Sequence, residues 1–171
     1  MKEFWTILSL LSTALILVSC SKSKDNVQSS KCEEQAMVEE TNIKLVRSFY
    51  EYMDRQDSMS LEKLIGNDFA LYFGSSEEPV KYHQIKPLIK EVYVAFPDFR
   101  HEIEIIFASG QYVTVKLDHI GTHKNTYMGI APSVKQISYK SIFIFTVEDG
   151  VITDVHVMED DLAALVKAQK L

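Results

Sequence analysis

Apolar residues recur at helical spacing in two segments of the chain. In residues 39–54 they fall at Ile43, Val46, Tyr50 and Met53, and Leu45 and Phe49 widen the stripe. The same period runs from Tyr82 to Phe96, and Pro97 stops it. Between these segments, Ser60 is suited to cap a short helix over residues 61–65 that Gly66 ends. The pattern therefore predicts three helices, two of them amphipathic.

Elsewhere the pattern predicts strands. A short apolar run at residues 69–73 indicates one strand, and in the next Ile103 and Ile105 alternate with two glutamates. The alternation continues in residues 111–120, 136–147 and 151–158, with hairpin turns at Ser109-Gly110 and Asp149-Gly150. A last helix is predicted over residues 161–170. Helices followed by hairpins indicate an α+β fold, with the helices packed on one face of an antiparallel sheet.

A bend rich in special backbone residues separates two of these strands. Gly121 and Gly129, followed by Pro132, are residues that let a strand bend, bulge or stop. We expect both glycines to occupy conformations or close contacts that a side chain would strain. His123, next to Gly121 in this stretch, is expected to organise the bend by hydrogen bonding. The stretch should therefore set how the two strands meet.

The chain begins with a segment typical of an export signal. A short charged start precedes an almost wholly apolar run from Phe4 to Val18, which is too short for a comfortable membrane span. The run ends in Leu17-Val18-Ser19-Cys20, which resembles the lipobox of bacterial lipoproteins. This resemblance implies cleavage before Cys20 and acylation of that cysteine, which would anchor the protein to a membrane without spanning it. The alternative is a plain secretory signal with a chance cysteine.

These features divide the chain into three parts. Residues 1–19 are predicted as a lipoprotein signal peptide, and residues 20–37, which have little to bury, as a lipidated flexible tether. Residues 38–171 are predicted as one folded domain. With Cys20 acylated, Cys32 has no intramolecular disulfide partner. The expected location is the bacterial cell envelope, with the domain facing the periplasm or the outside.

Charge and motif content exclude several classes of function. The formal net charge is -6 and basic residues form no cluster, so nucleic acid is not an expected partner. His119 and His123 lack a matching cluster of cysteines or carboxylates, so they make a poor metal site. The sequence has neither a Gly-rich phosphate loop nor a nucleophile elbow. We therefore expect no metal and no cofactor.

The order of several short motifs resembles that of a known family. Phe96-Pro97-Asp98 closes a helix, Gly121-Thr122-His123 leads to Gly129 and Pro132, and Asp149-Gly150 opens a strand that finishes in Asp160. Over residues 38–171 this order is similar to that of the SnoaL-like polyketide (ester) cyclases, which have a nuclear transport factor 2-like fold. The sequence departs from the family at Val134, where a glycine is common.

The resemblance implies both a shape and a reaction. The shape is a cone, formed by a strongly curved antiparallel sheet wrapped around the N-terminal helices, with an apolar pocket at its open end and often a dimeric assembly. The reaction is an intramolecular aldol cyclisation without metal or cofactor, in which an acidic side chain near the end of the last strand is the general acid/base. Asp160 matches that residue, although its place also suits the first turn of a terminal helix. Thr146 stands where cyclases have a basic residue or a histidine.

Other residues are candidates for lining the pocket. By strand parity His156 shares a side with Asp160, and His119 shares one with His123. Each has a structural alternative, because a lone histidine is more often a surface or core residue, and aromatic residues at these spacings are more often core. The pocket candidates are His156, His123, His119, Tyr50, Tyr72 and Tyr139.

Two functions stay open on the sequence alone. In the first, an envelope lipoprotein binds a small hydrophobic, carbonyl-containing molecule and performs cofactor-free acid/base chemistry of the cyclase or isomerase type at Asp160. In the second, the domain is a non-catalytic ligand-binding or protein-docking module, because a fold does not fix a function. Polyketide cyclisation itself is the less expected reaction, since polyketide cyclases work beside their synthases in the cytoplasm. A homodimer is compatible with either function.

Overall fold

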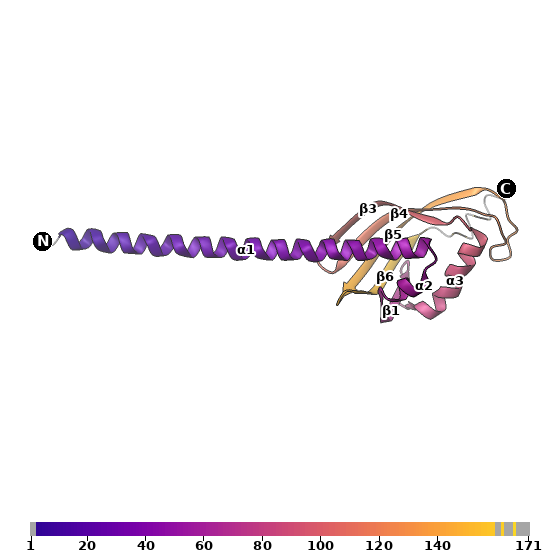
Figure 1. Cartoon of the computed structure of the whole chain (residues 1–171), viewed down its shortest axis with the longest axis horizontal. Coiled ribbons are helices and arrows are strands. Elements are labelled where there is room, and N and C mark those ends of the chain that lie inside the picture. The colour runs from indigo at the N-terminus through magenta and orange to yellow at the C-terminus, as the bar shows by residue number, and fades with distance from the viewer. Residues whose placement is uncertain (1–2, 160–161, 163–165, 167–171) are drawn as a thin grey trace. The chain divides into compact units, whose positions relative to one another are not determined.

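The computed structural model describes residues 3–159, 162 and 166, with side chains from Ser29 onward (Figure 1). Helix α1 runs from Glu3 to Asp54, and the chain divides into two compact units, Met1–Val38 and Glu39–Leu171. Residues 20–37, expected to be a flexible tether, belong to α1. The signal peptide and the lipid anchor stay predictions. No helix among the described residues is long and apolar enough to cross a membrane.

The second unit contains the end of α1 and two further helices. Helix α2 spans Ser58–Glu62 and α3 spans Tyr82–Ala95. The N-cap of α2 is Asp57, whose Oδ1 accepts the Ser60 N–H at 3.1 Å, so the prediction of Ser60 as the cap is wrong. Gly66, expected to end this helix, lies in the first strand instead. The helix predicted over residues 161–170 lies largely outside the described residues.

The strands form one open, six-stranded sheet in the order β2-β1-β6-β5-β4-β3. They are β1 (Ile65–Phe73), β2 (Val80–Lys81), β3 (Arg100–Ser109), β4 (Tyr112–Thr122), β5 (Gln136–Glu148) and β6 (Val151–Glu159). Strands β3 to β6 are successive antiparallel neighbours, as the alternation predicts. The sheet is mixed rather than purely antiparallel, because β1 pairs with β6 in parallel. The α+β cone fold is otherwise confirmed.

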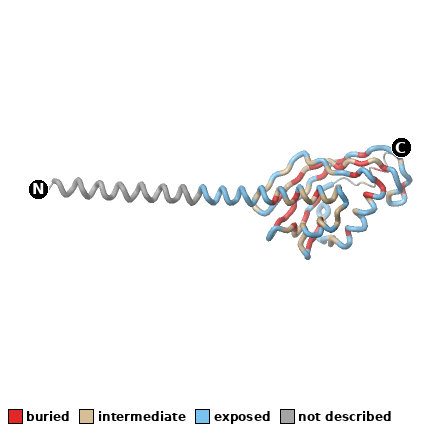
Figure 2. Tube along the Cα trace, in the orientation of Figure 1, coloured by how far each residue is buried: buried red, intermediate tan, exposed pale blue. Residues whose placement is uncertain are grey.

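The core lies on the concave face of the sheet, where the strands meet α1 and α3 (Figure 1). Along β4, Val113, Val115 and Leu117 are completely buried, and the residues between them face the other side. Figure 2 shows this alternation as buried and more exposed segments along the strands. Val46 of α1 packs into the same core. Burying each such side chain contributes about 1.5–3 kcal/mol, so this face is the main source of stability.

A β-bulge in β3 reverses which face its residues point to. Ile105 pairs with Lys116 but Ile103 pairs with Leu117, so one extra residue, Glu104, is inserted between them. As a result Ile103 packs against the core, whereas Ile105 is 51% exposed. The two isoleucines, which alternate regularly in the sequence, therefore lie on opposite faces of the sheet.

The bend after β4 is built by contacts with the end of α3. Gly121 packs so closely that an added Cβ would lie 2.9 Å from Cδ2 of Phe99 and 3.1 Å from Cβ of Phe96. Thr122 donates to Asp98 twice, from its N–H and from its Oγ1, each at 2.7 Å. His123 is fully buried and stacks on Phe96 with ring centroids 5.1 Å apart. The motifs around Asp98 and Gly121 thus form one structural unit.

The departure at Val134 has a conformational cost. This residue has a φ of 57°, in the left-handed region that a β-branched side chain adopts only under strain, and it is 73% exposed. Its N–H donates to the His123 carbonyl at 2.9 Å, which holds the backbone in place. A glycine at this position would avoid the strain, which agrees with the glycine expected in the family pattern.

We therefore expect Val134→Gly to stabilise the domain, by about 1 kcal/mol, because the strain relieved outweighs the added chain entropy of the unfolded state. Urea unfolding of both proteins at one pH measures the difference. Val151→Gly is a suitable control, since a strand residue with ordinary backbone should lose stability on the same change. A Val134→Gly protein less stable than the parent would contradict the assignment of strain.

Candidate functional site

An apolar cavity of about 320 Å³ opens on the concave face of the sheet, and we call it the cone pocket. Helices α1 and α3 and the strands of the sheet supply its walls. Its apolar lining includes Phe49, Phe69, Leu71, Phe99, Phe143 and Val155. A cavity of this size and character suits a small hydrophobic molecule.

A row of ring side chains crosses the sheet inside this pocket. His101 on β3 pairs with His119 on β4, which in turn pairs with Tyr139 on β5. The rings of His101 and His119 meet edge to face at 4.9 Å, and His119 stacks on Tyr139 at 4.4 Å. All of them line the cone pocket, so one row of the sheet presents three polar rings to the cavity.

His101 is held by a carboxylate from another element. Its Nδ1 lies 2.6 Å from Oδ1 of Asp54, the last residue of α1, and its backbone N–H donates to the Asp54 Oδ2 at 3.3 Å. The side chain of His101 is 4% exposed and that of Asp54 is 30% exposed. Because an ionised carboxylate only accepts hydrogen bonds, Nδ1 carries a proton and Nε2 is the nitrogen left for a bound molecule.

His119 has a different environment. Its Nε2 is hydrogen-bonded to Oγ of the buried Ser141, and the Glu159 carboxylate lies 3.9 Å from the same nitrogen. Burial, with a smaller contribution from His101, lowers the pKa of His119 to about 3. The burial effect exceeds any attraction from Glu159 because the ring is almost fully desolvated. His119 is therefore a neutral ring at physiological pH.

Several buried polar atoms of the pocket lack a hydrogen-bond partner among the described residues. They are the hydroxyl oxygens of Tyr50 and Tyr93 and the Nδ1 of His119. Burial raises the pKa of both tyrosines, helped by Glu159 for Tyr50 and by Asp54 for Tyr93, so both hydroxyls stay protonated donors. An unsatisfied buried group costs about 1–3 kcal/mol, which a suitable ligand atom would offset.

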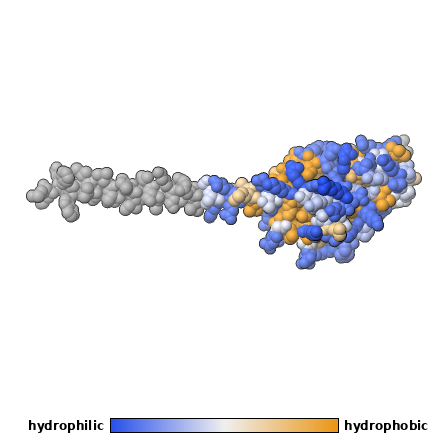
Figure 3. Space-filling view, in the orientation of Figure 1, coloured by the Kyte–Doolittle hydropathy of each residue, from blue (hydrophilic) through white to orange (hydrophobic). Residues whose placement is uncertain are grey.

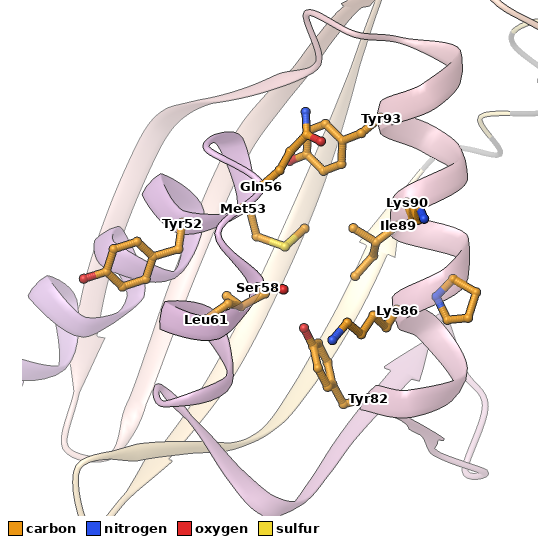
Figure 4. Close-up of a pocket in the computed structure, with 11 residues that line it drawn as sticks. Tyr52, Met53, Gln56, Ser58, Leu61, Tyr82, Lys86, Ile89, Lys90 and Tyr93 are labelled. Atoms are coloured by element: carbon orange, nitrogen blue, oxygen red, sulfur yellow. The ribbon is translucent and has the colours of Figure 1, made fainter.

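A second cavity, of about 430 Å³, lies between α1, α2 and α3, and we call it the helix cleft (Figure 4). It shares wall residues with the cone pocket, namely Met53, Leu61, Tyr82, Ile89 and Tyr93. Figure 4 shows Lys86 extending from α3 beside Tyr82. Lys86 forms an ion pair with Glu62 at 2.6 Å, so its charge is already balanced. The cleft is thus a side opening next to the cone pocket.

The residues predicted for the pocket fall into separate groups. Tyr50, His119 and Tyr139 line the cone pocket. His156 is 54% exposed and its ring stacks on that of Tyr72, with centroids 4.4 Å apart. It alternates along β6 with the buried Val155 and Val157, which places it on the outer face of the sheet. The expectation that His156 and Tyr72 line the pocket is therefore not met by this arrangement.

The remaining predicted residues do not contribute to the described pocket. The Nδ1 of His123 accepts the Ser133 N–H at 3.3 Å, which holds the bend after β4. Thr146 donates from Oγ1 to Asp154 at 2.9 Å. Asp160, the predicted acid/base, and the side chain of Cys20 lie outside the described residues.

Sequence reasoning missed the pair formed by His101 and Asp54. Asp54 ends a predicted helix and His101 follows Pro97 closely, and nothing in either neighbourhood resembles a motif. The available signal was the pairing of β3 with β4 across the Ser109-Gly110 turn. Counted back without a bulge, that pairing places His101 opposite Ile120 and on the wrong face, whereas the observed partner is His119.

Comparisons with known proteins agree with this architecture. The family model of the SnoaL-like polyketide cyclases matches residues 43–167. No curated relative matches the sequence. Among solved structures, AclR, a candidate hydroxylase of Streptomyces galilaeus, superimposes with a TM-score of 0.68 at 22% identity, covering 76% of this chain and 96% of its own.

Two further solved structures are similar to the same extent. IdmH, a candidate polyketide cyclase of Streptomyces antibioticus, has a TM-score of 0.65 at 21% identity, with 75% of this chain and 97% of its own covered. A SnoaL-like candidate cyclase of Jannaschia sp. CCS1 has a TM-score of 0.67 at 19% identity, with coverages of 77% and 94%. These likenesses show the nuclear transport factor 2-like fold, and with the family match they establish that the chain belongs to the SnoaL-like polyketide cyclase family.

Proposed function

We propose that the cone pocket binds a small hydrophobic molecule that contains a carbonyl group and subjects it to cofactor-free acid/base chemistry of the cyclase or isomerase type. The observation that carries this proposal is an apolar cavity of about 320 Å³ lined by buried polar atoms. Those of Tyr50, Tyr93 and His119 include atoms without a hydrogen-bond partner among the described residues. Apolar walls supply affinity, and the hydroxyls and imidazoles supply orientation. Membership of the SnoaL-like family agrees with this use of the pocket.

Binding is testable with prodan, a small hydrophobic ketone whose fluorescence reports an apolar environment. Leu88 and Val94 form a matched pair on α3, because they are 55% and 54% exposed but only Leu88 lines the cone pocket. We expect Leu88→Glu to weaken prodan binding by about tenfold, since a charge at the mouth of the pocket is costly to desolvate, and Val94→Glu to leave the Kd unchanged. Equal Kd values for the two variants, or no binding to the parent chain, would contradict the proposed pocket.

A second surface favours a role in association. Ile105, Phe107, Ile142, Ile144 and Met158 are all more than two-fifths exposed on the outer face of the sheet. Figure 3 shows apolar surface on the domain over β3 and β4. Paired positive and negative side chains border these residues, such as Lys116 with Glu104 at 2.6 Å and Lys140 with Asp118 at 2.8 Å. Because these charges balance, two copies of the face would not repel each other.

We therefore propose that this outer face mediates a homodimer, with docking of another protein as the alternative use. Apolar patches of this kind are common at interfaces between subunits. The molar mass of the full chain in solution distinguishes the two, because a charge at the centre of a self-complementary patch, as in Ile144→Glu, would dissociate a homodimer.

The last element of the proposed function is its place in the cell. We propose that the protein is a lipoprotein of the bacterial envelope, anchored through Cys20, because an apolar run precedes a lipobox-like sequence. Cys20→Ser should prevent acylation and move the protein from the membrane fraction to the soluble fraction. A variant that stays in the membrane fraction as fully as the parent would rule out the lipid anchor.

A further inference from the structure

The row of rings in the cone pocket has a different environment at each end. At one end, the Asp54 carboxylate is hydrogen-bonded to His101. Burial, with a smaller contribution from the same carboxylate, raises the pKa of Tyr93. At the other end, His119 is bonded to Ser141, and the Glu159 carboxylate lies 3.9 Å from the same nitrogen. The two histidine rings meet between these ends. A ligand in the pocket therefore faces both imidazoles at once.

The two histidines are equipped for different tasks. His119 is buried away from water and neutral, so it can orient a ligand but does not take up a proton readily near neutral pH. His101 has a carboxylate on its Nδ1, which fixes the ring and stabilises the imidazolium that proton uptake at Nε2 creates. A pair of titratable groups in contrasting environments is the usual division between a base and a hydrogen-bonding group.

The buried tyrosines supply the donors that such a base requires. The Tyr50 ring lies 5.1 Å from the His101 ring, and Tyr50 is 4% exposed with no partner for its hydroxyl among the described residues. The Tyr93 hydroxyl also has no hydrogen-bond partner among the described residues, and Tyr93 is 7% exposed. Neutral hydroxyls in a desolvated site strengthen their bonds to an oxygen that becomes negatively charged.

From this arrangement we propose that His101 is the general base of the cone pocket, taking a proton from a carbon next to a carbonyl group of the ligand. Asp54 is the positioning residue, and the Tyr50 and Tyr93 hydroxyls donate to oxygen atoms of the ligand. This assignment rests on the proposed function, and it deepens that function by naming the ligand as a carbon acid with at least two oxygen acceptors. It assigns the base to His101, whereas the resemblance to the family implied Asp160.

The step balances without any co-reactant. The C–H bond breaks, the proton moves to Nε2 of His101, and the electron pair of that bond becomes the new C=C bond of an enolate. The carbonyl π electrons move to oxygen, where the charge is stabilised by the tyrosine hydroxyls. Return of the proton to another carbon gives an isomer, and attack of the enolate carbon on a second carbonyl gives a ring.

The probe for this chemistry is 5-nitrobenzisoxazole, a small aromatic carbon acid. A base removes its C3 proton, the C–H electron pair forms a nitrile, and the N–O bond breaks to leave a coloured phenolate. The reaction needs only a base and a hydrogen-bond donor for the leaving oxygen. The full chain is used throughout, and prodan binding to each variant shows whether the pocket is intact.

We expect the wild-type chain to open the probe faster than free imidazole does, and His101→Gln to lower kcat/KM at least 100-fold. Tyr50→Phe should lower it by about tenfold or more. Asp54→Asn should lower kcat with little change in KM, because the His101 ring would lose the carboxylate that fixes its orientation. Added imidazole should restore part of the rate of His101→Gly, which a purely structural role of His101 would not allow.

Matched controls separate this inference from the proposed function. His156→Gln, on the exposed side of β6, should keep the parent rate. If prodan binds but the wild-type chain opens the probe no faster than imidazole, the base assignment fails and ligand binding stands. Loss of the rate in Asp160→Asn with full activity in His101→Gln would also overturn the assignment, in favour of Asp160. If prodan does not bind at all, the proposed function fails and the base assignment fails with it.

Discussion

We expect Gly121→Val to destabilise the domain by about 3 kcal/mol, the largest effect of a single substitution in the bend after β4. An added Cβ would lie 2.9 Å from the Phe99 ring and 3.1 Å from Phe96, which is completely buried. It would also lie 3.4 Å from the Phe99 Cα, so a shift of the Phe99 ring alone would not make room for the larger branched side chain. Thermal unfolding of the full chain measures the loss as a lower Tm.

Two substitutions in the same stretch are the controls. At Gly129 an added Cβ meets nothing within 4 Å, and only the φ of 76° is unfavourable, so Gly129→Val should cost about 1–2 kcal/mol. Lys124 is exposed, and Lys124→Ala should change the stability little. Equal Tm values for the Gly121 and Gly129 variants would show that close packing against α3 does not matter.

The bend after β4 also shows why the sequence predicts the position of a structural feature without predicting the contacts that it makes. The glycines, Pro132 and the Phe96-Pro97-Asp98 motif are visible as local signals. Their function in the fold is a contact between distant segments, in which Asp98 accepts from Thr122 and the Ala95 carbonyl accepts from Lys124 at 2.9 Å. Local spacing holds no information about such contacts, so the bend could be located from the sequence but not explained.

The same limit applies to the sheet. Alternation identifies β3 to β6 because each strand is buried on one face, and short turns make sequential strands antiparallel neighbours. Strand β1 has no such turn to β6, and its parallel pairing depends on how α2 and α3 place it. Pairing between strands that are far apart in the chain is a tertiary property, and the periodicity of a single strand does not reveal it.

The candidate site depended on a single inserted residue. His119 and Tyr139 could be proposed from strand parity, since β4 and β5 pair without interruption. Tyr50 could be proposed from the helical spacing of apolar residues in α1. His101 could not, because the bulge at Glu104 changes the face to which the start of β3 points. A bulge has no fixed sequence signal, so the alternation of Ile103 with Ile105 suggested a regular strand. Glu104, whose insertion turns His101 toward the pocket, therefore does not itself line the pocket.

The second large effect is a dependence of stability on pH that comes from His119. Burial gives this ring a pKa of about 3 in the folded domain, whereas an unfolded histidine has a pKa of about 6.5. Below about pH 6.5 the unfolded chain therefore binds a proton that the folded domain excludes, and stability is lost progressively as the pH falls toward 3. Above about pH 6.5 both states are neutral and the contribution is constant.

We accordingly expect the free energy of unfolding to fall by about 2 kcal/mol between pH 7.5 and pH 5, over and above the change shown by a His119→Gln chain. Glutamine retains a polar group for Ser141 but does not titrate. The charged groups facing His119 act in opposite directions: a protonated His101 at 4.9 Å makes uptake of a second proton harder, and Glu159 at 3.9 Å makes it easier. His156→Gln is the matched control, because it removes a histidine that is 54% exposed on the outer face of the sheet. Urea unfolding of each chain at the two pH values measures this difference. If the His119→Gln chain shows the same pH dependence as the parent, the pocket accommodates a protonated His119. The two histidines could then not be divided into a base and a neutral hydrogen-bonding ring.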